Sequence, residues 1–289
     1  MTDRQIVFLG YGYTAHALAR RLRPAGWRIG ATARSAQKAA AIERDGARAI
    51  PWTEAGIDSA AFDRASAVLV STPPGEDGCP ALAAAGQALA ARAGEIAWIG
   101  YLSSNGVYGD HGGAWVDEFS PLRAASGRGL RRIAAEADWA AFGATWDLPV
   151  VIFRLPGIYG PGRSALDAVR EGRARRVVKE GQVFNRMHVD DIAAALEASL
   201  ARPAAGALFN LADDEPAPPQ DVVEYACALL GAPPPPPVAF EEAELSEMGR
   251  SFYLENKRVR NDRMKQALGV KLAYPTYREG LRAILTAGG

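Results

Sequence analysis

The sequence is poor in cysteine, carries no excess of charge of either sign and contains no long apolar run. Its two cysteines, Cys79 and Cys227, lie far apart, with no His or Cys nearby at the spacing of metal ligands. We therefore expect neither a disulfide framework nor a metal site. No segment approaches the ~20 apolar residues that span a bilayer, and the first apolar run, Ile6 to Leu9, is too short for the core of a signal peptide. These absences predict a soluble, cytoplasmic protein without a membrane partner.

The charge balance also excludes a class of partner. Lysine and arginine together number 33, aspartate and glutamate also number 33, and the formal net charge is zero. A general nucleic-acid binder gains affinity by neutralising phosphates with excess basic residues, so nucleic acid is not an expected partner. The 289 residues, 48% of them hydrophobic, can bury a substantial core. Small molecules or other protein chains are the expected partners.

Short β-branched runs alternate with alanine-rich segments of helical length through the first two thirds of the chain. Strands are predicted at QIVFLG, WRIGATA, ASAVLVS, EIAWIGYLSS, PVVIFRLP and ALFNLA, and helices at 15–25, 35–45, 80–93, 129–142 and 190–201. Strand-helix alternation predicts an α/β fold with a Rossmann-type, doubly wound parallel sheet covered on both faces.

The composition changes after Ala212, where prolines precede a helix candidate and the run Pro233 to Pro237 predicts a stiff, extended linker. Residues 241–289 have the pattern of a small helical lobe that ends in an amphipathic helix. The expected domains are a Rossmann domain at 1–154, to which 186–213 add the last helix and strand, and a smaller substrate-side lobe formed by 155–185 and 214–289.

The segment FLGYGYTAHALARRL combines a strand, a glycine turn and a helix. Gly10, Gly12 and Ala15 fill the pattern G-x-G-x-x-A, which allows a tight turn, close approach of backbone N–H groups to a pyrophosphate, and close helix-strand packing. Tyr13 and Thr14 lie within the same turn. These residues predict a dinucleotide site at the start of the chain.

The end of the second strand indicates which dinucleotide is preferred. A site selective for NAD(H) places Asp or Glu there against the ribose 2′-hydroxyl. This sequence has Arg34 and Ser35 instead, with no acid between Trp27 and Ile42. A guanidinium and a hydroxyl suit a 2′-phosphate, so we expect NADP(H) to be preferred, with NAD(H) also possible as a ligand.

Several later segments resemble the extended short-chain dehydrogenase/reductases, the NAD-dependent epimerase/dehydratase group. They occur in the family's order: YLSSNGVYGD, WVDEFSPLR, a helix ending in AAE, FRLPGIYGPGR, RMHVDDIA and ENKRVRNDRMKQALGVKLAYPTYREGL. The resemblance implies a nucleotide-binding domain with a C-terminal lobe that closes over a substrate cleft. We also expect Ser71 and Pro156 to contact the cofactor.

The family's chemistry uses a Ser or Thr, a Tyr that transfers a proton, and a Lys that lowers the pKa of that Tyr and binds the nicotinamide ribose. The serine corresponds to Ser104. The Tyr and Lys positions are held by Arg128 and Arg132, which keep the spacing of four on one helix face. An arginine pKa of about 12.5 or higher leaves no accessible neutral form near pH 7, so the usual proton relay is missing. The chain therefore resembles atypical members of the superfamily, in which Arg132 can still donate to ribose hydroxyls.

Two interpretations of the arginines remain open. In the simpler one, Arg132 forms an exposed ion pair with Glu136, worth only about 0.3–0.5 kcal/mol, and Arg128 is solvated near the helix start. In the other, both face the cleft and grip an anionic ligand, a carboxylate or a phosphate.

A catalytic protein would need a different proton donor. His111, in a glycine-rich loop, has a charge that is tunable near neutral pH, and Tyr159 supplies a hydroxyl in a segment that the resemblance places near the cofactor. The candidate catalytic residues are therefore Ser104, His111 and Tyr159, and each also has a purely structural explanation.

Three functions are compatible with these observations. The first is an NADP(H)-binding oxidoreductase or epimerase-like enzyme that acts on a small carbonyl or sugar-derived substrate with a non-standard proton donor. The second is a non-catalytic module that binds NADP(H) and reports redox state to a partner, and the third is a scaffold with a vacant nucleotide site. The resemblance also suggests a homodimer through the helices around 80–93 and 129–142.

Overall fold

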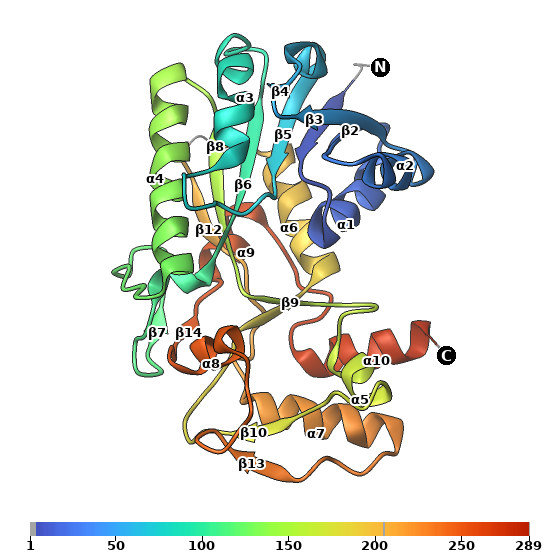
Figure 1. Ribbon diagram of the computed structural model, residues 1–289, viewed down its shortest axis with the longest axis vertical. Helices are drawn as coiled ribbons and strands as arrows, with labels where there is room; N and C mark the ends of the chain where they lie inside the picture. The colour runs from blue at the N-terminus through green and yellow to red at the C-terminus, as the bar shows by residue number, and fades with distance from the viewer. Residues whose placement is uncertain (1–3, 205, 289) are drawn as a thin grey trace.

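The computed structural model describes residues 4–204 and 206–288, and it divides into a large sheet-containing part and a smaller lobe below it (Figure 1). The large sheet consists of β1 (Gln5–Leu9), β2 (Arg28–Ala33), β3 (Arg48–Thr53), β4 (Gly56–Ile57), β5 (Ala65–Val70), β6 (Trp98–Ser104), β8 (Val150–Leu155) and β12 (Leu208–Asn210). The strand order is β12-β8-β6-β5-β1-β2-β3-β4, and only the β3–β4 pair is antiparallel. The predicted Rossmann-type sheet is confirmed. The prediction did not include β3, in which Pro51 interrupts an otherwise weak strand pattern.

Helices cover both faces of this sheet because alternate side chains of each buried strand point to opposite faces. One face is covered by α1 (Tyr13–Leu22), α2 (Ala36–Arg44), α6 (Val189–Ala201) and α9 (Asp262–Leu268), the other by the short η1 (Ser59–Phe62), α3 (Pro80–Ala90) and α4 (Gly127–Trp146). Along β1, Phe8 belongs to the core on the face that α1 covers, and Val7 belongs to the core on the face that α3 covers. Burial of each such side chain contributes about 1.5–3 kcal/mol to folding.

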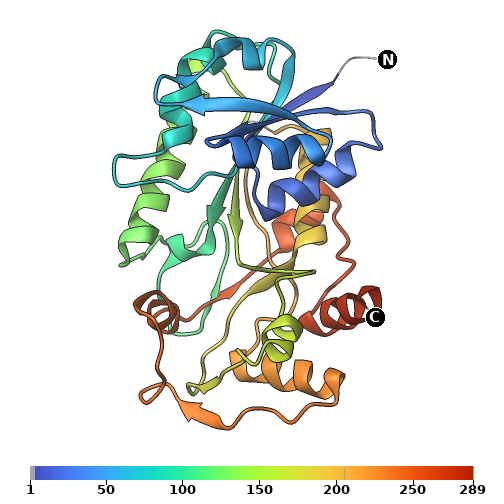
Figure 2. The ribbon, with the colours of Figure 1, turned by 45° about the vertical axis from the view of Figure 1, so that its right-hand side comes forward.

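The smaller lobe consists of short elements that sit under the carboxyl ends of the large sheet's strands (Figures 1 and 2). They are β9 (Gly157–Tyr159), α5 (Ala165–Arg170), β10 (Arg176–Val178), β11 (Arg186–His188), α7 (Pro219–Leu230), β13 (Pro237–Ala239), α8 (Glu247–Tyr253) and α10 (Tyr277–Ala287). Strands β9 and β11 pair with each other, as do β10 and β13. The run that was expected to be only a linker thus ends in a strand, since Pro237 pairs with Arg176.

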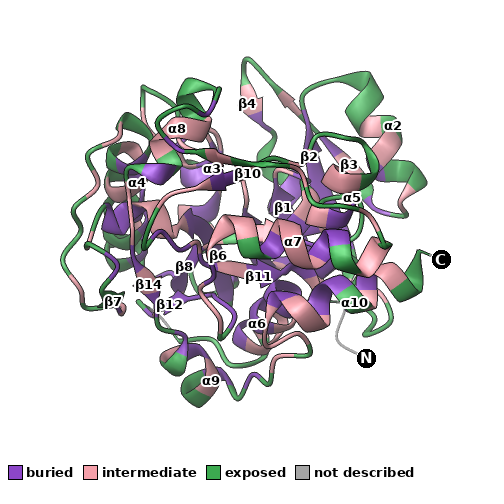
Figure 3. Ribbon diagram, turned by 90° about the horizontal axis from the view of Figure 1, so that it is seen from below, coloured by how far each residue is buried: buried purple, intermediate pink, exposed green. Residues whose placement is uncertain are grey.

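A separate core holds the lobe together. Tyr159, Leu166, Tyr277 and Leu281 are buried in one cluster between α5, α7 and α10. Viewed from the lobe, α7 and α10 show buried and exposed residues along their lengths, as expected of helices with one face on a core (Figure 3).

Two features connect the parts. The turn η2 (Asn105–Tyr108) follows β6, and the short strands β7 (Trp115–Val116) and β14 (Arg258–Val259) pair beside the lobe. Helix α9 packs on α6 and β12, and its Met264 lies in the core of the large sheet. The residues of α9 were expected in the lobe.

The domain boundaries stay predictions. Within the described residues, no helix is long and apolar enough to cross a membrane.

Candidate functional site

The glycine turn lies between β1 and α1, where the chain must bend sharply. Gly10 has a φ of +97°, a conformation that L residues with side chains rarely adopt. Its N–H donates to Thr32 Oγ1 at 2.8 Å, and its carbonyl accepts from Ser71 Oγ at 3.0 Å. A Cβ on Gly10 would lie 2.8 Å from Ser71 Oγ. This position therefore requires glycine for both its backbone conformation and its space.

Gly12 has a different reason to be small. It is the N-cap residue of α1, no side chain caps this helix, and no atom lies within 4 Å of the place where its Cβ would be. The first N–H groups of a helix have no partner within the helix and attract anions. The open space over this helix end therefore fits the pyrophosphate of a dinucleotide.

A cavity of about 250 Å³ lies against this helix end. Its lining comes from the start of α1, the ends of β5, β6 and β8 with the residues that follow them, β9 and the loop after it, and α4. The lining residues are Gly12, Tyr13, Thr14, Ala15, Ser71, Leu102, Ser103, Ser104, Arg132, Leu155, Pro156, Ile158 and Arg163. Most of the expected cofactor residues thus come together in one place. We refer to this space as the cofactor cavity.

A polar cluster that the sequence analysis missed holds the glycine turn in place. The Tyr11 hydroxyl donates to Asp45, which also accepts from Arg23 Nη2 at 2.7 Å and lies 3.0 Å from His16 Nε2. Burial alone would raise the pKa of Asp45, but the hydrogen bonds from Arg23 and Tyr11 outweigh it and lower the pKa to about 2. Asp45 lies 34 residues from Tyr11, so no local pattern indicated this contact.

The end of β2 presents basic side chains to solvent. Arg34 is exposed and stacks on Trp52, with its guanidinium carbon 4.1 Å from the ring centroid. Ser35 caps α2 by accepting from Lys38 N–H at 3.2 Å, and Lys38 Nζ donates to the Tyr11 carbonyl at 2.6 Å. Arg34, Ser35 and Lys38 therefore form a basic, hydroxyl-bearing edge beside the glycine turn.

A larger cleft of about 580 Å³ adjoins the cofactor cavity and runs between the sheet part and the lobe. Ser104, Pro156, Ile158, Arg132 and Arg163 line both spaces. The cleft also has residues from α4, from the segment before β11 and from α8 and the loop that follows it: Ser126, Arg128, Val183, Phe184, Asn185, Ser251, Phe252, Tyr253, Glu255 and Lys257. A ligand in this cleft would lie next to one in the cofactor cavity, and we call this space the substrate cleft.

The simpler interpretation of the two arginines fails for Arg132 only. Arg132 Nη1 donates to the Leu102 carbonyl at 2.6 Å, and it makes no ion pair with Glu136. Arg128 is exposed near the start of α4, as expected. Its Nη2 also donates to Ser251 Oγ at 3.2 Å, and its guanidinium lies 4.7 Å from the Phe252 ring centroid.

Glu136 is instead the buried partner of Arg154. Arg154 Nη2 donates to Glu136 Oε2 at 2.7 Å, and Ser103 Oγ donates to Glu136 Oε1 at 2.5 Å. Arg154 Nη1 also donates to the Tyr108 hydroxyl at 2.9 Å. The side chains of Arg154 and Glu136 are only 5% and 7% exposed, so this pair fixes α4, β6 and β8 against one another. It thereby positions Arg132, one turn before Glu136.

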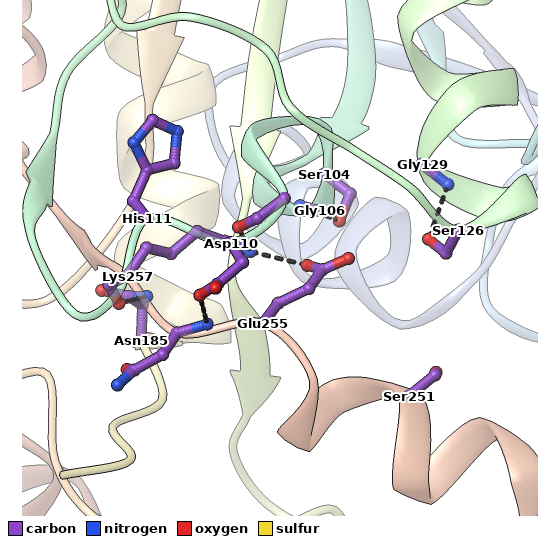
Figure 4. A network of polar contacts seen from close by, with 12 residues as sticks. Ser104, Gly106, Asp110, His111, Ser126, Gly129, Asn185, Ser251, Glu255 and Lys257 are labelled. Carbon is purple, nitrogen blue, oxygen red and sulfur yellow. Dashed lines mark hydrogen bonds and ion pairs between the residues drawn. The ribbon is translucent and has the colours of Figure 1, made fainter.

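Lys257 is a cleft residue that the sequence analysis did not identify. Its side chain is 7% exposed, and Nζ donates to Glu255 Oε2 at 2.7 Å and to the Gly109 carbonyl at 2.9 Å. Figure 4 shows the Lys257 and Glu255 side chains pointing toward one another. The Asn185 side chain holds the backbone next to Lys257, since it donates to the Lys257 carbonyl and accepts from Val259 N–H. The lysine is visible in the sequence motif ENKRV, but only the fold shows that it lines the cleft.

The other candidate acids lie elsewhere. His111 lies on a loop with its ring directed away from Lys257 (Figure 4), and its Nε2 is 3.2 Å from the Pro121 carbonyl. The Tyr159 hydroxyl donates to the Thr276 carbonyl at 3.3 Å, and burial raises the pKa of Tyr159. Neither residue lines the substrate cleft. Their catalytic roles stay predictions, whereas Ser104 lies where the two spaces meet.

Residues 88–212 match the family model of the NAD dependent epimerase/dehydratase family. A 3-diazoavenalumate denitrifying reductase from a Streptomyces species is 32% identical over 157 residues, which are 52% of this chain and only about half, 51%, of that relative. A functionally unknown conserved protein from Silicibacter pomeroyi DSS is 50% identical over 99% of both chains, with a TM-score of 0.92.

A more distant neighbour shares the fold. The dTDP-glucose 4,6-dehydratase of Bacillus anthracis, solved in complex with NAD, has a TM-score of 0.74 at 17% identity, with 98% of this chain and 96% of that chain covered. The expected resemblance is confirmed by the family model and by the fold. Residues 88–212 are thus similar to the NAD dependent epimerase/dehydratase family, and the chain as a whole shares the fold of this dehydratase.

Proposed function

We propose that this protein is an NADPH-dependent reductase of a small molecule, with a proton donor other than the family's tyrosine. The observation that carries the proposal is the continuity of the two spaces: Ser104 and Arg132 line both the cofactor cavity and the substrate cleft. A bound dinucleotide and a bound substrate would therefore meet at Ser104. The curated relative that is named a reductase favours catalysis over a purely binding module.

The preference for the phosphorylated cofactor rests on the end of β2. A 2′-phosphate needs cationic and hydroxyl donors, and Arg34, Ser35 and Lys38 supply them at this edge. Arg34 makes no ion pair with a carboxylate of the described residues, so its charge is not already neutralised. Stacking on Trp52 also holds the guanidinium in place before a ligand binds, which reduces the entropy lost on binding.

A reduced nicotinamide supplies a hydride ion when it is bound. In the reduction of a carbonyl group, the new C–H bond forms as the C=O π pair moves to oxygen, and that oxygen then requires a proton. Lys257 is suited to supply it, because Gly109 and Glu255 leave one ammonium hydrogen for the cleft that Lys257 lines. The Glu255 side chain is 20% exposed and can return a proton from solvent. Ser104, which lines the same cleft, would donate a hydrogen bond to this oxygen.

Thermal unfolding with NADP⁺, NADPH, NAD⁺ and NADH in turn tests the cofactor assignment. Binding to the folded state alone stabilises a protein by about 2.7 kcal/mol at a ligand concentration of 100 Kd. We expect stabilisation by the phosphorylated pair, reduced in Arg34→Ala and retained in Arg170→Ala, which removes an exposed arginine of α5. Equal responses to NADPH and NADH would refute the preference. The absence of any response would refute the proposed function.

A further inference from the structure

The substrate cleft has an unusual excess of positive charge for a protein whose net charge is zero. The cationic side chains in its wall are those of Arg128, Arg132, Arg163, Arg186 and Lys257, and the only acidic side chain in that wall is Glu255, which pairs with Lys257. Among the described residues, no carboxylate forms an ion pair with Arg128, Arg132, Arg163 or Arg186. Four guanidinium groups therefore line the cleft without an ion pair, which favours an anionic ligand.

These four arginines do not have the same surroundings. Arg186 Nη1 donates to the carbonyls of Phe184 and Ala217. Arg132 and Arg163 also line the cofactor cavity, where a dinucleotide offers ribose hydroxyls and phosphates to them. Arg128 lines only the substrate cleft. Its charge is therefore available to a ligand other than the cofactor.

The position of Arg128 is defined on both sides of the cleft. It comes from the first turn of α4, and it reaches Ser251 Oγ at 3.2 Å and the Phe252 ring at 4.7 Å, both on α8. Both partners are neutral, and the hydrogen bond to Ser251 uses only one of the guanidinium N–H groups. The remaining N–H groups can form the paired hydrogen bonds that a carboxylate accepts from arginine.

The rest of the cleft wall is largely apolar. Phe184 packs edge-on against Tyr253 with ring centroids 5.1 Å apart, and Ile158 and Val183 line the same space. Phe252 is 51% exposed in spite of its size. The guanidinium of Arg128, beside aromatic and branched apolar side chains, suits a ligand with a negative charge and a flat or apolar body.

We propose that Arg128, which stands at the position of the family's proton-transferring tyrosine, anchors the carboxylate of the substrate, and that the substrate is an aromatic carboxylate with a reducible group. This inference rests on the proposed function for the reducible group and on the cleft alone for the carboxylate. It assigns a substrate-binding role to a residue that replaces a catalytic one.

Paired probes test the inference without the true substrate. Cinnamate and cinnamamide have the same body and differ in charge, and propionate keeps the carboxylate but lacks the ring. Isothermal titration of each into the full-length protein, with and without saturating NADP⁺, gives their dissociation constants. We expect cinnamate to bind about 10- to 100-fold more tightly than cinnamamide, because hydrogen bonds to charged groups are worth more than neutral ones. Propionate should bind more weakly than cinnamate.

Variants of α4 locate the charge that matters. Arg128→Gln should abolish the preference for cinnamate over cinnamamide, and Arg128→Lys should restore only part of it, because a lysine makes no paired contact. Arg131→Gln is the matched control, since Arg131 lies on the same helix and does not line the cleft. Its preference should equal that of the wild type.

Several results would overturn the inference. They are equal binding of cinnamate and cinnamamide, a preference that survives Arg128→Gln, tighter binding of phenyl phosphate than of cinnamate, or no binding of cinnamate at about 1 mM, the weak end of measurable affinity. The proposed function fails separately. If cinnamate binds as expected but no dinucleotide stabilises the protein, the carboxylate site stands and the reductase proposal falls.

Discussion

Removal of the Arg154 side chain should destabilise the protein strongly, because it leaves a carboxylate buried without its cation. In the wild type, Arg154 Nε lies 3.1 and 3.2 Å from the two carboxylate oxygens of Glu136, and Nη2 lies 2.7 Å from Oε2. Both side chains are less than a tenth exposed. Loss of one partner from such a pair costs about 3–5 kcal/mol.

The double variant separates the charge from the packing. Arg154→Met alone leaves Glu136 ionised and buried, with Ser103 as its remaining hydrogen-bond donor. Glu136→Gln together with Arg154→Met leaves no buried charge, so much of the lost stability should return. The two substitutions are expected to couple by more than about 1 kcal/mol in a double-mutant cycle.

Urea unfolding followed by circular dichroism at several pH values is the assay. In Arg154→Met, the unpaired and buried Glu136 should have a pKa above that of the unfolded chain, near 4.3. The folded state then binds a proton that the unfolded state does not, so this variant should gain stability as the pH falls from 7 toward about 5. A cost below about 1 kcal/mol, or a double variant no more stable than the single one, would refute this account of the pair.

Three further predictions concern the site. Gly12→Val should change the free energy of unfolding by less than about 1 kcal/mol, since no neighbouring atom lies within 4 Å of the new Cβ. The same substitution should abolish thermal stabilisation by NADP(H). A large loss of stability in the absence of cofactor would contradict this prediction. The lowered pKa of Asp45, about 2, means that its contribution to stability is complete above about pH 4 and is lost as the pH falls toward 2. Asp45→Asn should therefore reduce the free energy of unfolding by about 1–2 kcal/mol at pH 7 and flatten this acid limb, as unfolding curves between pH 2 and 7 would show. Lys257→Met should lower kcat for NADPH-dependent reduction about 10²- to 10⁴-fold while the NADPH-induced rise in Tm persists, and an unchanged kcat would exclude Lys257 as the proton donor.

The large sheet and the glycine turn could be predicted from the sequence because their signals are local. Buried parallel strands are continuous apolar runs, and Gly10 needs a positive φ that few other residues adopt. Arg128 and Arg132, which stand where the resemblance places Tyr and Lys, are likewise visible in the sequence. The loss of the proton relay that they imply stays a prediction.

The partners of these residues could not be predicted, because they depend on contacts between distant segments. The spacing of four favoured a pair between Arg132 and Glu136, but in the fold Glu136 points inward to Arg154, 18 residues away. Arg128 meets Ser251, which lies 123 residues later. The proline run was read as a linker because strand pairing of Pro237 depends on β10 being alongside.

The sequence by itself determined the type of sheet, the glycine turn and the basic end of β2, and it predicts the loss of the usual proton relay. Only the tertiary structure decided which polar groups face the substrate cleft: Lys257 and Arg128 line it, whereas His111 and Tyr159 do not. The physical reason is that spacing along a helix or strand fixes which face a side chain occupies. What lies opposite that face depends on how the lobe folds back over the carboxyl ends of the strands.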